Sequence, residues 1–423
     1  MKGGINSSNG GGHPAGGGHP AGGGHPAGGG HPAGGGHPAG GGHPAGGGHP
    51  AGGGHPGELP EQVATRLVGQ TWPGHVFDRA PRNVYWETTL ACDLACRHCR
   101  ADAQPDADPR ELTTEEGRAL LRSVKELGSM VVLTGGDPMK RPDLFELIEY
   151  ARGLRVPVAV TPSTTPMLER GQVLRMRELG VSALGVSIDA PDAASHDGFR
   201  QVPGTFDCSM NALAWAREAG IAVQVNTTVT TETMPRLEEL FRLLADEQSP
   251  PVRRWSLFLL VPVGRGLELG VPSAEQVEEL FAWVYEISRD APFHVSTVEA
   301  PHYRRYWIQR RLEEGSTADE VNALGRRMGF GFRDGNGIVF VSHTGDVYPA
   351  GFLPHPLLGN VRGQPLEDIY RRSPALIELR DADRLEGACG ECEYRYVCGG
   401  SRARGYSMTG SVLGPDPFCI LAS

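Results

Sequence analysis

The feature that most constrains the fold of this chain is a regular alternation of short apolar runs and helical patterns between residues 83 and 290. The apolar runs are rich in Val and Ile and have no polar face, as in parallel strands that helices cover on both sides. We expect strands over residues 84–86, 131–133, 156–161, 184–188, 223–228 and 255–260. Helical patterns separate them, over residues 114–127, 143–153, 167–179, 206–219 and 234–245.

Six strand–helix units predict an α/β fold of the partial-barrel type, because a closed barrel of this kind needs eight of them. Thr113 with Glu116 is typical of a capped helix start. In such a barrel the functional groups gather at the C-terminal ends of the strands. The chemistry of the chain is therefore expected in the segments that directly follow the six strands.

The chain changes character after about residue 290, where the residues become charged and mixed. Residues 337–341 and 346–348 predict a hairpin that turns at His343-Thr344-Gly345, and a short helix is expected over 366–372. The domain boundaries that we expect are a tail at 1–57, a lead-in segment at 58–81, the partial barrel at 82–290, a linker and helical segment at 291–334, and a small loop-rich domain at 335–423.

The N-terminal tail is a low-complexity repeat. From Gly10 to Pro56 the unit His-Pro-Ala-Gly-Gly-Gly recurs, and it holds eight of the 15 histidines. Such a sequence has nothing to bury, so we expect it to be disordered. Its histidines are compatible with weak binding of nickel, copper or zinc, but a solvated tail is the interpretation we favour. It has no apolar core of the kind found in secretory signal peptides.

The composition argues against several classes of partner. The chain has 40 Lys and Arg against 50 Asp and Glu, a formal net charge of −10, which argues against nucleic acid. No apolar run approaches the roughly 20 residues of a membrane span. Seven of the eight cysteines fall into two clusters with metal-ligand spacing. Such clusters are typical of a cytoplasmic metal-binding protein, not of a disulfide-bonded secreted one.

The first cluster is Cys92-Asp-Leu-Ala-Cys96-Arg-His-Cys99, directly after the first expected strand. Soft thiolates suit iron–sulfur clusters and zinc, but a structural zinc site closes with four ligands. Three close thiolates with no evident fourth indicate a metal site that is open to a small molecule. The alternative is that the three cysteines are structural residues of a loop.

This spacing resembles the radical S-adenosylmethionine (SAM) superfamily. The resemblance implies a 4Fe–4S cluster on the catalytic residues Cys92, Cys96 and Cys99, with SAM bound at the fourth iron. It further implies an oxidoreductase that cleaves SAM reductively to a 5′-deoxyadenosyl radical, which abstracts hydrogen from a substrate C–H bond. An electron donor such as flavodoxin or ferredoxin would be a partner.

The same resemblance assigns SAM-binding roles to residues at later strand ends. It implies contacts to SAM from the turn Gly135-Gly136-Asp137, where Asp replaces the usual Glu, and from Ser187, Asp189, Asn226, Arg200 and His98. Taken alone, the glycine turn is also compatible with an ordinary strand-to-helix connection, and His98 with a surface histidine.

The second cluster comprises Cys389, Cys392, Cys398 and Cys419, a set that closes either a zinc site or a 4Fe–4S cluster. This segment resembles the SPASM/twitch extension of radical SAM enzymes, which implies one auxiliary 4Fe–4S cluster. Ala350 and Ser401 stand where many relatives carry a further ligand cysteine. Cys208 is expected to be a small buried hydrophobic residue.

The substrate that the resemblance implies is either a ribosomal peptide or a tetrapyrrole whose propionate side chains are trimmed. Six arginines are candidates to bind carboxylates, although a solvated helix face also explains the first four: Arg304, Arg305, Arg310, Arg311, Arg402 and Arg404. A protein of another class, a non-catalytic iron–sulfur electron carrier or metal-handling protein, remains as the alternative. A carrier would gain from four ligands at both clusters.

Overall fold

A computed structural model describes residues 75–246 and 252–422. The repeat tail and most of the lead-in segment expected from the sequence lie outside these residues. In the part of the chain that is described, no helix combines the length and the apolar character needed to cross a membrane.

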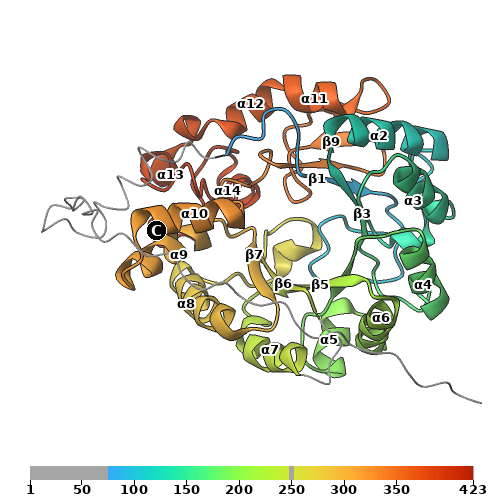
Figure 1. Ribbon diagram of the computed structural model, residues 1–423, viewed down its shortest axis with the longest axis horizontal. Coiled ribbons are helices and arrows are strands. Elements are labelled where there is room, and N and C mark those ends of the chain that lie inside the picture. Colours follow the sequence, from blue (N-terminus) through green and yellow to red (C-terminus); the bar gives the residue numbers. More distant parts are fainter. Residues whose placement is uncertain (1–74, 247–251, 423) are drawn as a thin grey trace, which may run out of the picture. The chain divides into compact units, whose positions relative to one another are not determined.

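The core of the fold is one twisted sheet in the strand order β10-β9-β8-β1-β2-β3-β4-β5-β6-β7 (Figure 1). The strands from β8 through β1 to β7 pair in parallel, whereas β9 and β10 add antiparallel strands at one edge. The strands are β1 Asn83–Glu87, β2 Met130–Thr134, β3 Val158–Val160, β4 Ala183–Ser187, β5 Ala222–Val229, β6 Arg254–Leu259, β7 His294–Val298, β8 Ile338–Val341, β9 Asp346–Tyr348 and β10 Gly359–Asn360.

Helices line the outer side of the sheet, as Figure 1 shows. The α-helices of the described residues are α2 Thr114–Leu127, α3 Leu144–Gly153, α4 Arg170–Glu178, α5 Ala193–Arg200, α6 Thr205–Ala219, α7 Leu237–Ala245, α8 Ala274–Asp290, α9 Tyr303–Glu313, α10 Ala318–Met328, α11 Leu366–Arg372, α12 Pro374–Arg380, α13 Gly387–Glu391 and α14 Arg402–Thr409. Thr113 caps α2 in a capping box with Glu116, as its sequence predicts.

The six strands predicted from the sequence are all present, and the α/β partial-barrel fold is confirmed. A seventh parallel strand, β7, lies in the segment that the sequence analysis assigned to a linker and helices. Its residues His-Val-Ser-Thr-Val carry little of the Val and Ile character of the other strands, because one face of this edge strand is polar. The apolar pattern was therefore too weak to predict it.

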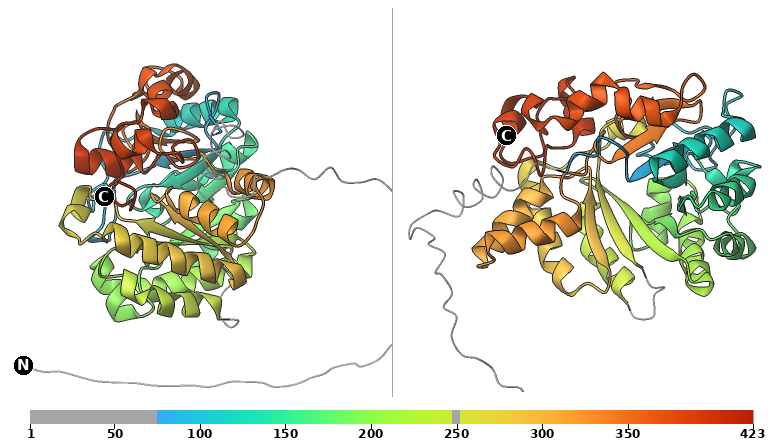
Figure 2. Two further views of the ribbon diagram at one scale, coloured as in Figure 1. Left: turned by 90° about the vertical axis from the view of Figure 1, so that its left-hand side faces the viewer. Right: turned by 45° about the horizontal axis from the view of Figure 1, so that its top comes forward.

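The predicted hairpin is present as β8 and β9, but it does not stand apart from the barrel. β8 pairs in parallel with β1, with Tyr85 opposite Phe340, so the C-terminal region extends the same sheet. Helix α11 also packs against α2 (Figures 1 and 2). All described residues fall in one compact unit, and the boundary at residue 335 stays a prediction.

The two faces of the sheet have different roles. Val84 and Trp86 of β1 are fully buried in the main apolar core, between the sheet and its helices. The alternating residues Tyr85 and Glu87 therefore point to the inner side of the barrel. The parallel strands all run in the same direction. The loops that follow their C-terminal ends therefore lie together at one end of the barrel.

Candidate metal centres

The first cysteine group lies directly after β1, at the strand end where functional groups were expected. Cys92 and Cys96 are buried and Cys99 is half-buried. They pack with Leu94 and Ala103 in a small apolar cluster of their own. The structure thus brings the three predicted ligands together on one short loop.

The surroundings of these sulfur atoms suit metal-bound thiolates. The N–H groups of Leu94 and Ala103 donate to Cys92 Sγ and Cys99 Sγ at 3.4 and 3.5 Å. Burial raises the pKa of the Cys92 and Cys96 thiols, so a bound metal would have to stabilise the thiolate form. The donor set fits an iron–sulfur cluster with three protein ligands.

The predicted Gly135-Gly136-Asp137 turn packs against this cysteine loop. The N–H of Gly136 donates to Thr89 O at 2.8 Å, and that of Asp137 to Ala91 O at 2.6 Å. A Cβ atom at Gly136 would lie only 2.3 Å from Ala91 O, so only glycine fits there. The turn therefore holds the loop in place, whatever it also does for a ligand.

Asp137 itself is fully buried. Its carboxylate accepts hydrogen bonds from the N–H groups of Met139 and Ser163 and from the Thr165 hydroxyl. Burial raises its pKa despite these donors. Its predicted contact with the SAM amino group stays a prediction.

Asp189 and Arg200 form a buried ion pair beside the cysteine loop. Arg200 Nε donates to Asp189 Oδ2 at 2.8 Å, and Arg200 Nη1 lies 3.7 Å from Cys96 Sγ. Burial alone would raise the pKa of Asp189, but the charge of Arg200 outweighs it and holds that pKa below its usual value. Arg200 thus joins the end of β4 to the loop, and its predicted contact with the SAM carboxylate stays a prediction.

His98 is half-buried beside the cysteine loop. Its ring stacks on Phe199, with centroids 4.8 Å apart and planes inclined by 11°. Burial lowers the pKa of His98 to about 3. Within the described part of the chain, its Nδ1 atom has no hydrogen-bond partner. A neutral ring of this kind is consistent with the predicted place near the adenine of SAM, which stays a prediction.

Ser187 and Asn226 lie opposite each other on the adjacent strands β4 and β5. Both are half-buried. Asn226 Oδ1 accepts a hydrogen bond from Gln224 Nε2 at 2.8 Å. The structure brings the two predicted polar positions together, and their contacts to SAM stay predictions.

The second cysteine group lines one pocket. Its walls include the predicted residues Cys389, Cys392, Cys398 and Cys419. Within residues 75–246 and 252–422, no three His, Cys, Asp or Glu side chains lie close enough together to hold a single metal ion. A zinc ion would need its four thiolates in a tight tetrahedron, whereas a cluster of four irons spreads its ligands around a larger core. The donor set of four thiolates fits a fully ligated iron–sulfur cluster.

Backbone and arginine donors surround these sulfur atoms as well. The N–H groups of Asp416, Tyr394 and Gly400 each donate at 3.4 Å, to Cys389, Cys392 and Cys398 respectively. Arg402 Nη2 lies 3.7 Å from Cys389 Sγ. Gly400 has a φ of +64°, and a Cβ atom there would lie 3.2 Å from the same sulfur, so glycine suits this turn best.

One residue of this pocket was missed by the sequence analysis. His302 is 1 % exposed, and its Nδ1 atom lies 3.5 Å from Asp416 Oδ2. Burial lowers the pKa of His302 to about 3. Its position after β7 was the only signal in the sequence, and that strand was itself not predicted.

Ala350 and Ser401, the two departures from the cysteine pattern, have protein partners. Ala350 packs in an apolar cluster with Leu353 and Ala403. Ser401 caps α14, and its hydroxyl donates to the Glu299 carboxylate. This packing agrees with a single auxiliary cluster. Cys208 lies half-buried in α6, away from both cysteine groups.

The structure gives each of the six arginines predicted to bind a substrate carboxylate a partner within the protein, and that binding stays a prediction. Their partners are the backbone oxygen of Val397 for Arg304, Glu278 for Arg305, Glu313 for Arg310, Glu314 for Arg311, the backbone oxygen of Gly414 for Arg402, and Asp416 for Arg404. Arg402 and Arg404 are fully buried. Arg310 and Arg311 form surface ion pairs, in agreement with the solvated-face alternative.

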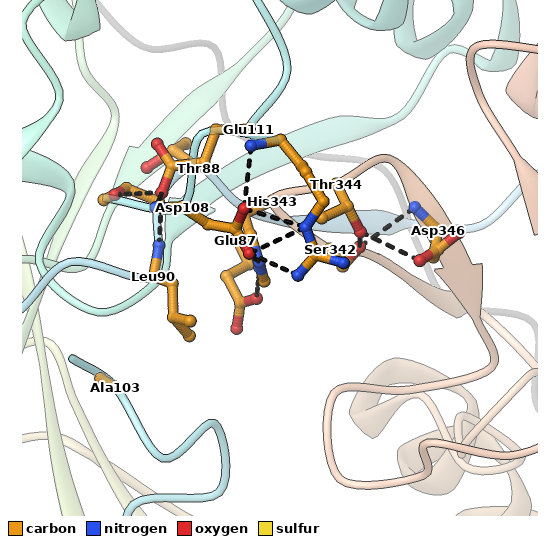
Figure 3. A network of polar contacts seen from close by, with 12 residues as sticks. Glu87, Thr88, Leu90, Ala103, Asp108, Glu111, Ser342, His343, Thr344 and Asp346 are labelled. Carbon is orange, nitrogen blue, oxygen red and sulfur yellow. Dashed lines mark hydrogen bonds and ion pairs between the residues drawn. The ribbon is translucent and has the colours of Figure 1, made fainter. Parts of the chain in front are cut away.

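A polar network at the first site was not predicted. Glu87, the last residue of β1, accepts hydrogen bonds from Arg100 Nη2 at 2.9 Å and His343 Nδ1 at 2.7 Å. His343 stands in the turn between β8 and β9, and its Nε2 atom lies 3.5 Å from Asp108 Oδ2. Figure 3 shows Glu87 beside His343. A charged residue at the end of an apolar strand was the available signal in the sequence.

The charges in this network support one another. Burial alone would raise the pKa of Glu87, but Arg100 and His343 outweigh it and hold that pKa below its usual value. Burial would likewise lower the pKa of His343, yet Glu87 and Asp108 raise it above 6.5. The turn between β8 and β9 is thus tied electrostatically to the strand that precedes the cysteine loop.

Comparison with known proteins identifies relatives over most of the chain. A family model described as the radical SAM superfamily matches residues 86–244. An AdoMet-dependent heme synthase of Oleidesulfovibrio alaskensis is 40% identical over 352 residues, covering 82% of this chain and 89% of that protein. The mycofactocin maturase MftC of Mycolicibacterium smegmatis is 28% identical over 383 residues, covering 85% and 87%.

A solved structure resembles the fold as a whole. SuiB of Streptococcus suis, bound to S-adenosylmethionine, superposes with a TM-score of 0.62 over 81% of this chain and 78% of its own. Its sequence is 15% identical, so the likeness concerns the fold alone.

Proposed function

The chain belongs to the radical SAM superfamily, and from that premise we propose that it oxidises propionate side chains of a tetrapyrrole. The membership confirms the prediction made from the cysteine spacing and sets aside the alternative of a non-catalytic carrier. The protein is a radical SAM enzyme with a SPASM-type C-terminal region that acts on a tetrapyrrole or a peptide. The narrower choice of a tetrapyrrole is our proposal.

The observation that carries this choice is the difference between the two kinds of relative. The heme synthase is 40% identical to the chain, whereas the peptide maturase is 28% identical, over comparable shares of the sequence. Substrate-contacting residues are expected to diverge between enzymes of different substrate class. The higher identity therefore favours the tetrapyrrole.

The cofactors are a 4Fe–4S cluster with SAM and one auxiliary 4Fe–4S cluster. Together the first cluster and SAM supply a carbon radical that removes one hydrogen atom from a substrate C–H bond. On a propionate, loss of that hydrogen is followed by cleavage of the bond to the carboxylate. A vinyl group and carbon dioxide form, and one electron is left over. That electron needs an acceptor, and the auxiliary site is the acceptor we propose.

The protein positions and encloses these groups. We propose that Cys92, Cys96 and Cys99 hold the first cluster, and that Cys389, Cys392, Cys398 and Cys419 hold the auxiliary one. The buried Asp189–Arg200 pair and the Gly136 turn keep the first loop in one conformation. This favours a fixed distance between the first metal centre and the substrate. The remaining residues proposed to contact SAM are His98, Gly135, Asp137, Ser187 and Asn226.

Two further assignments belong to the proposal. None of the eight cysteines forms a disulfide, and cysteines stay reduced in a reducing compartment, so we place the enzyme in the cytoplasm. The electron that starts each turnover would come from a small donor such as flavodoxin or ferredoxin.

The test is an anaerobic assay of the reconstituted enzyme with SAM, dithionite and Fe-coproporphyrin III, an iron tetrapyrrole with propionate side chains. We expect vinyl-bearing porphyrin products, carbon dioxide and 5′-deoxyadenosine. Mass spectrometry measures the porphyrin products and 5′-deoxyadenosine. If SAM is cleaved but no porphyrin side chain changes, while an added candidate peptide loses hydrogen, the substrate assignment is wrong.

A further inference from the structure

We propose that Arg100 is the residue that binds a carboxylate of the substrate, with Glu87 and His343 as its positioning residues. This inference rests on the proposed function and names the group that recognises the propionate.

Arg100 lies on the inner side of the barrel, next to the first metal centre. It directly follows Cys99 and donates to Glu87, which points inward from the end of β1. Its guanidinium lies over the ring of Phe340, with 4.4 Å between the carbon and the ring centroid. Phe340 is opposite Tyr85 in the sheet and stands on the same inner side.

The backbone around Arg100 is held from the far side of the barrel. The N–H of Arg265 donates to Cys99 O at 3.0 Å, and Arg265 Nε donates to Cys96 O at 2.9 Å. Arg265 stands in the short 3₁₀ turn Gly264–Glu268 that follows β6. The loop after β6 thus holds the backbone of Cys96 and Cys99, the segment that leads into Arg100.

The guanidinium of Arg100 is held by a hydrogen bond on one edge, and part of its side chain is exposed. One of its five N–H donors bonds to Glu87, and its side chain keeps 21% of its surface exposed. Its flat face rests on Phe340, as arginine does on aromatic rings. Among the described residues, no partner bonds to the other N–H groups, so they can bind a planar group whose two oxygens share one negative charge, such as a carboxylate.

Glu87 would compete with a substrate carboxylate if its charge were not balanced. His343 balances it through the 2.7 Å contact, so Arg100 does not neutralise Glu87 alone. Glu87 and His343 therefore hold the side chain in place and leave its charge for a ligand. Pre-organisation of this kind lowers the ordering cost of binding.

The neighbouring surface suits the rest of a tetrapyrrole. The loop after β9 passes beside Arg100, since a Cβ atom at Gly351 would lie 3.4 Å from Arg100 Nε. The next residue, Phe352, lies 6.4 Å from Phe258 of β6, measured between ring centroids. A flat apolar ligand with carboxylate arms would meet aromatic side chains and a cation together. A carboxylate on Arg100 would also hold its neighbouring C–H groups close to the first metal centre.

The contrast with other arginines sharpens the assignment. Arg304 and Arg402 donate hydrogen bonds to backbone oxygens. Arg404 is fully buried and paired with Asp416. Arg200 is 8% exposed and is bound to Asp189 through two nitrogen atoms. Arg100 combines an inner position, a fixed face and free donors.

The experiment compares Arg100→Met with Arg97→Met, a control on the same loop whose arginine is paired on the surface with Glu232. Each protein is reconstituted anaerobically and titrated with Fe-coproporphyrin III and with its methyl ester, using the porphyrin absorption band. We expect the wild type and R97M to prefer the free acid. R100M should lose about 10- to 100-fold in affinity for the acid and little for the ester.

Two further measurements distinguish a loss of carboxylate binding from damage to the metal centre. Iron content and SAM cleavage without substrate should stay within about twofold of wild type in R100M, since neither needs the carboxylate. Arg100→Lys should recover part of the affinity, because it keeps the charge but not the fork of donors.

The failures are distinguishable. If R100M binds the free acid as tightly as the wild type does, the inference is overturned and the proposed function stands. If the wild type binds neither porphyrin, the proposed function fails and the inference falls with it. A loss of iron in R100M, but not in R100K, would assign Arg100 to the metal centre and would also overturn the inference.

Discussion

The two cysteine groups differ in how the chain builds them and in the charges around them. The first places three thiols within eight residues on a loop, beside the neutralised pair Asp189–Arg200 and the buried Asp137. The second gathers four thiols over 31 residues, next to arginines such as Arg402 that bond to backbone oxygens. A short, anchored loop with one ligand missing suits ligand binding, whereas a closed set of four suits electron storage.

The electrostatic difference supports the same division. Cationic groups and hydrogen bonds near an iron–sulfur cluster favour its reduced form. At the second site Arg402 donates to Cys389, and the half-buried Arg304 and the buried Arg305 act electrostatically on Cys398. At the first site Arg200 likewise donates to Cys96, but its charge is offset by Asp189. We therefore expect the auxiliary cluster to accept electrons more readily than the SAM-binding one.

The largest expected effect would come from Cys96→Ala. Removing one of only three ligands should abolish SAM cleavage, because the first site has no spare thiolate. Formation of 5′-deoxyadenosine under dithionite measures this, and Cys208→Ala is the matched control. Cleavage that survives in C96A at more than about a tenth of the wild-type rate would break the comparison.

Cys419→Ala should separate the two sites. SAM cleavage without substrate should continue, whereas oxidised product should fall by at least about tenfold, because the surplus electron loses its acceptor. The ratio of product to 5′-deoxyadenosine measures the uncoupling. Equal loss of both activities would show that the two sites do not divide the work.

Gly136→Ala should weaken the first site alone. The new Cβ atom would lie 2.3 Å from Ala91 O, so the cysteine loop must shift. We expect the variant to bind several-fold less iron at the first cluster, measured by electron paramagnetic resonance, and to keep the auxiliary signal. Gly153→Ala in α3 is the control, because nothing lies within 4 Å of its added atom.

The smallest effect concerns pH. The pKa of His343 is raised above 6.5 in the folded protein by Glu87 and Asp108. Its contribution to stability is therefore complete below about pH 6.5 and is lost as the pH rises through the raised value. In His343→Gln that part of the pH dependence should vanish, a difference on the order of 2 °C in Tm. Thermal unfolding of both proteins between pH 6 and 9 measures it.

Much of the fold could be predicted because it depends on local patterns. The six apolar strands each show their character within a few residues, and the capping box of Thr113 and Glu116 spans a single helical turn. β7 could not be predicted, because its residues are largely polar and it forms a strand through its pairing with β6. The parallel pairing of β8 with β1 joins segments far apart in the sequence.

The candidate site divides in the same way. The cysteine spacing predicted the family and the residues that the structure gathers into two groups, because these ligands lie at short intervals in the sequence. At the second group, spacing alone left zinc and a 4Fe–4S cluster as alternatives. Only the tertiary structure decided which charges remain available. Arg402 and Arg404 are buried among partners. Arg100, in contrast, keeps N–H groups without a partner among the described residues, beside Glu87, which His343 contacts from 256 positions away in the sequence. Whether a side chain is saturated depends on contacts between distant segments, and no local pattern records them.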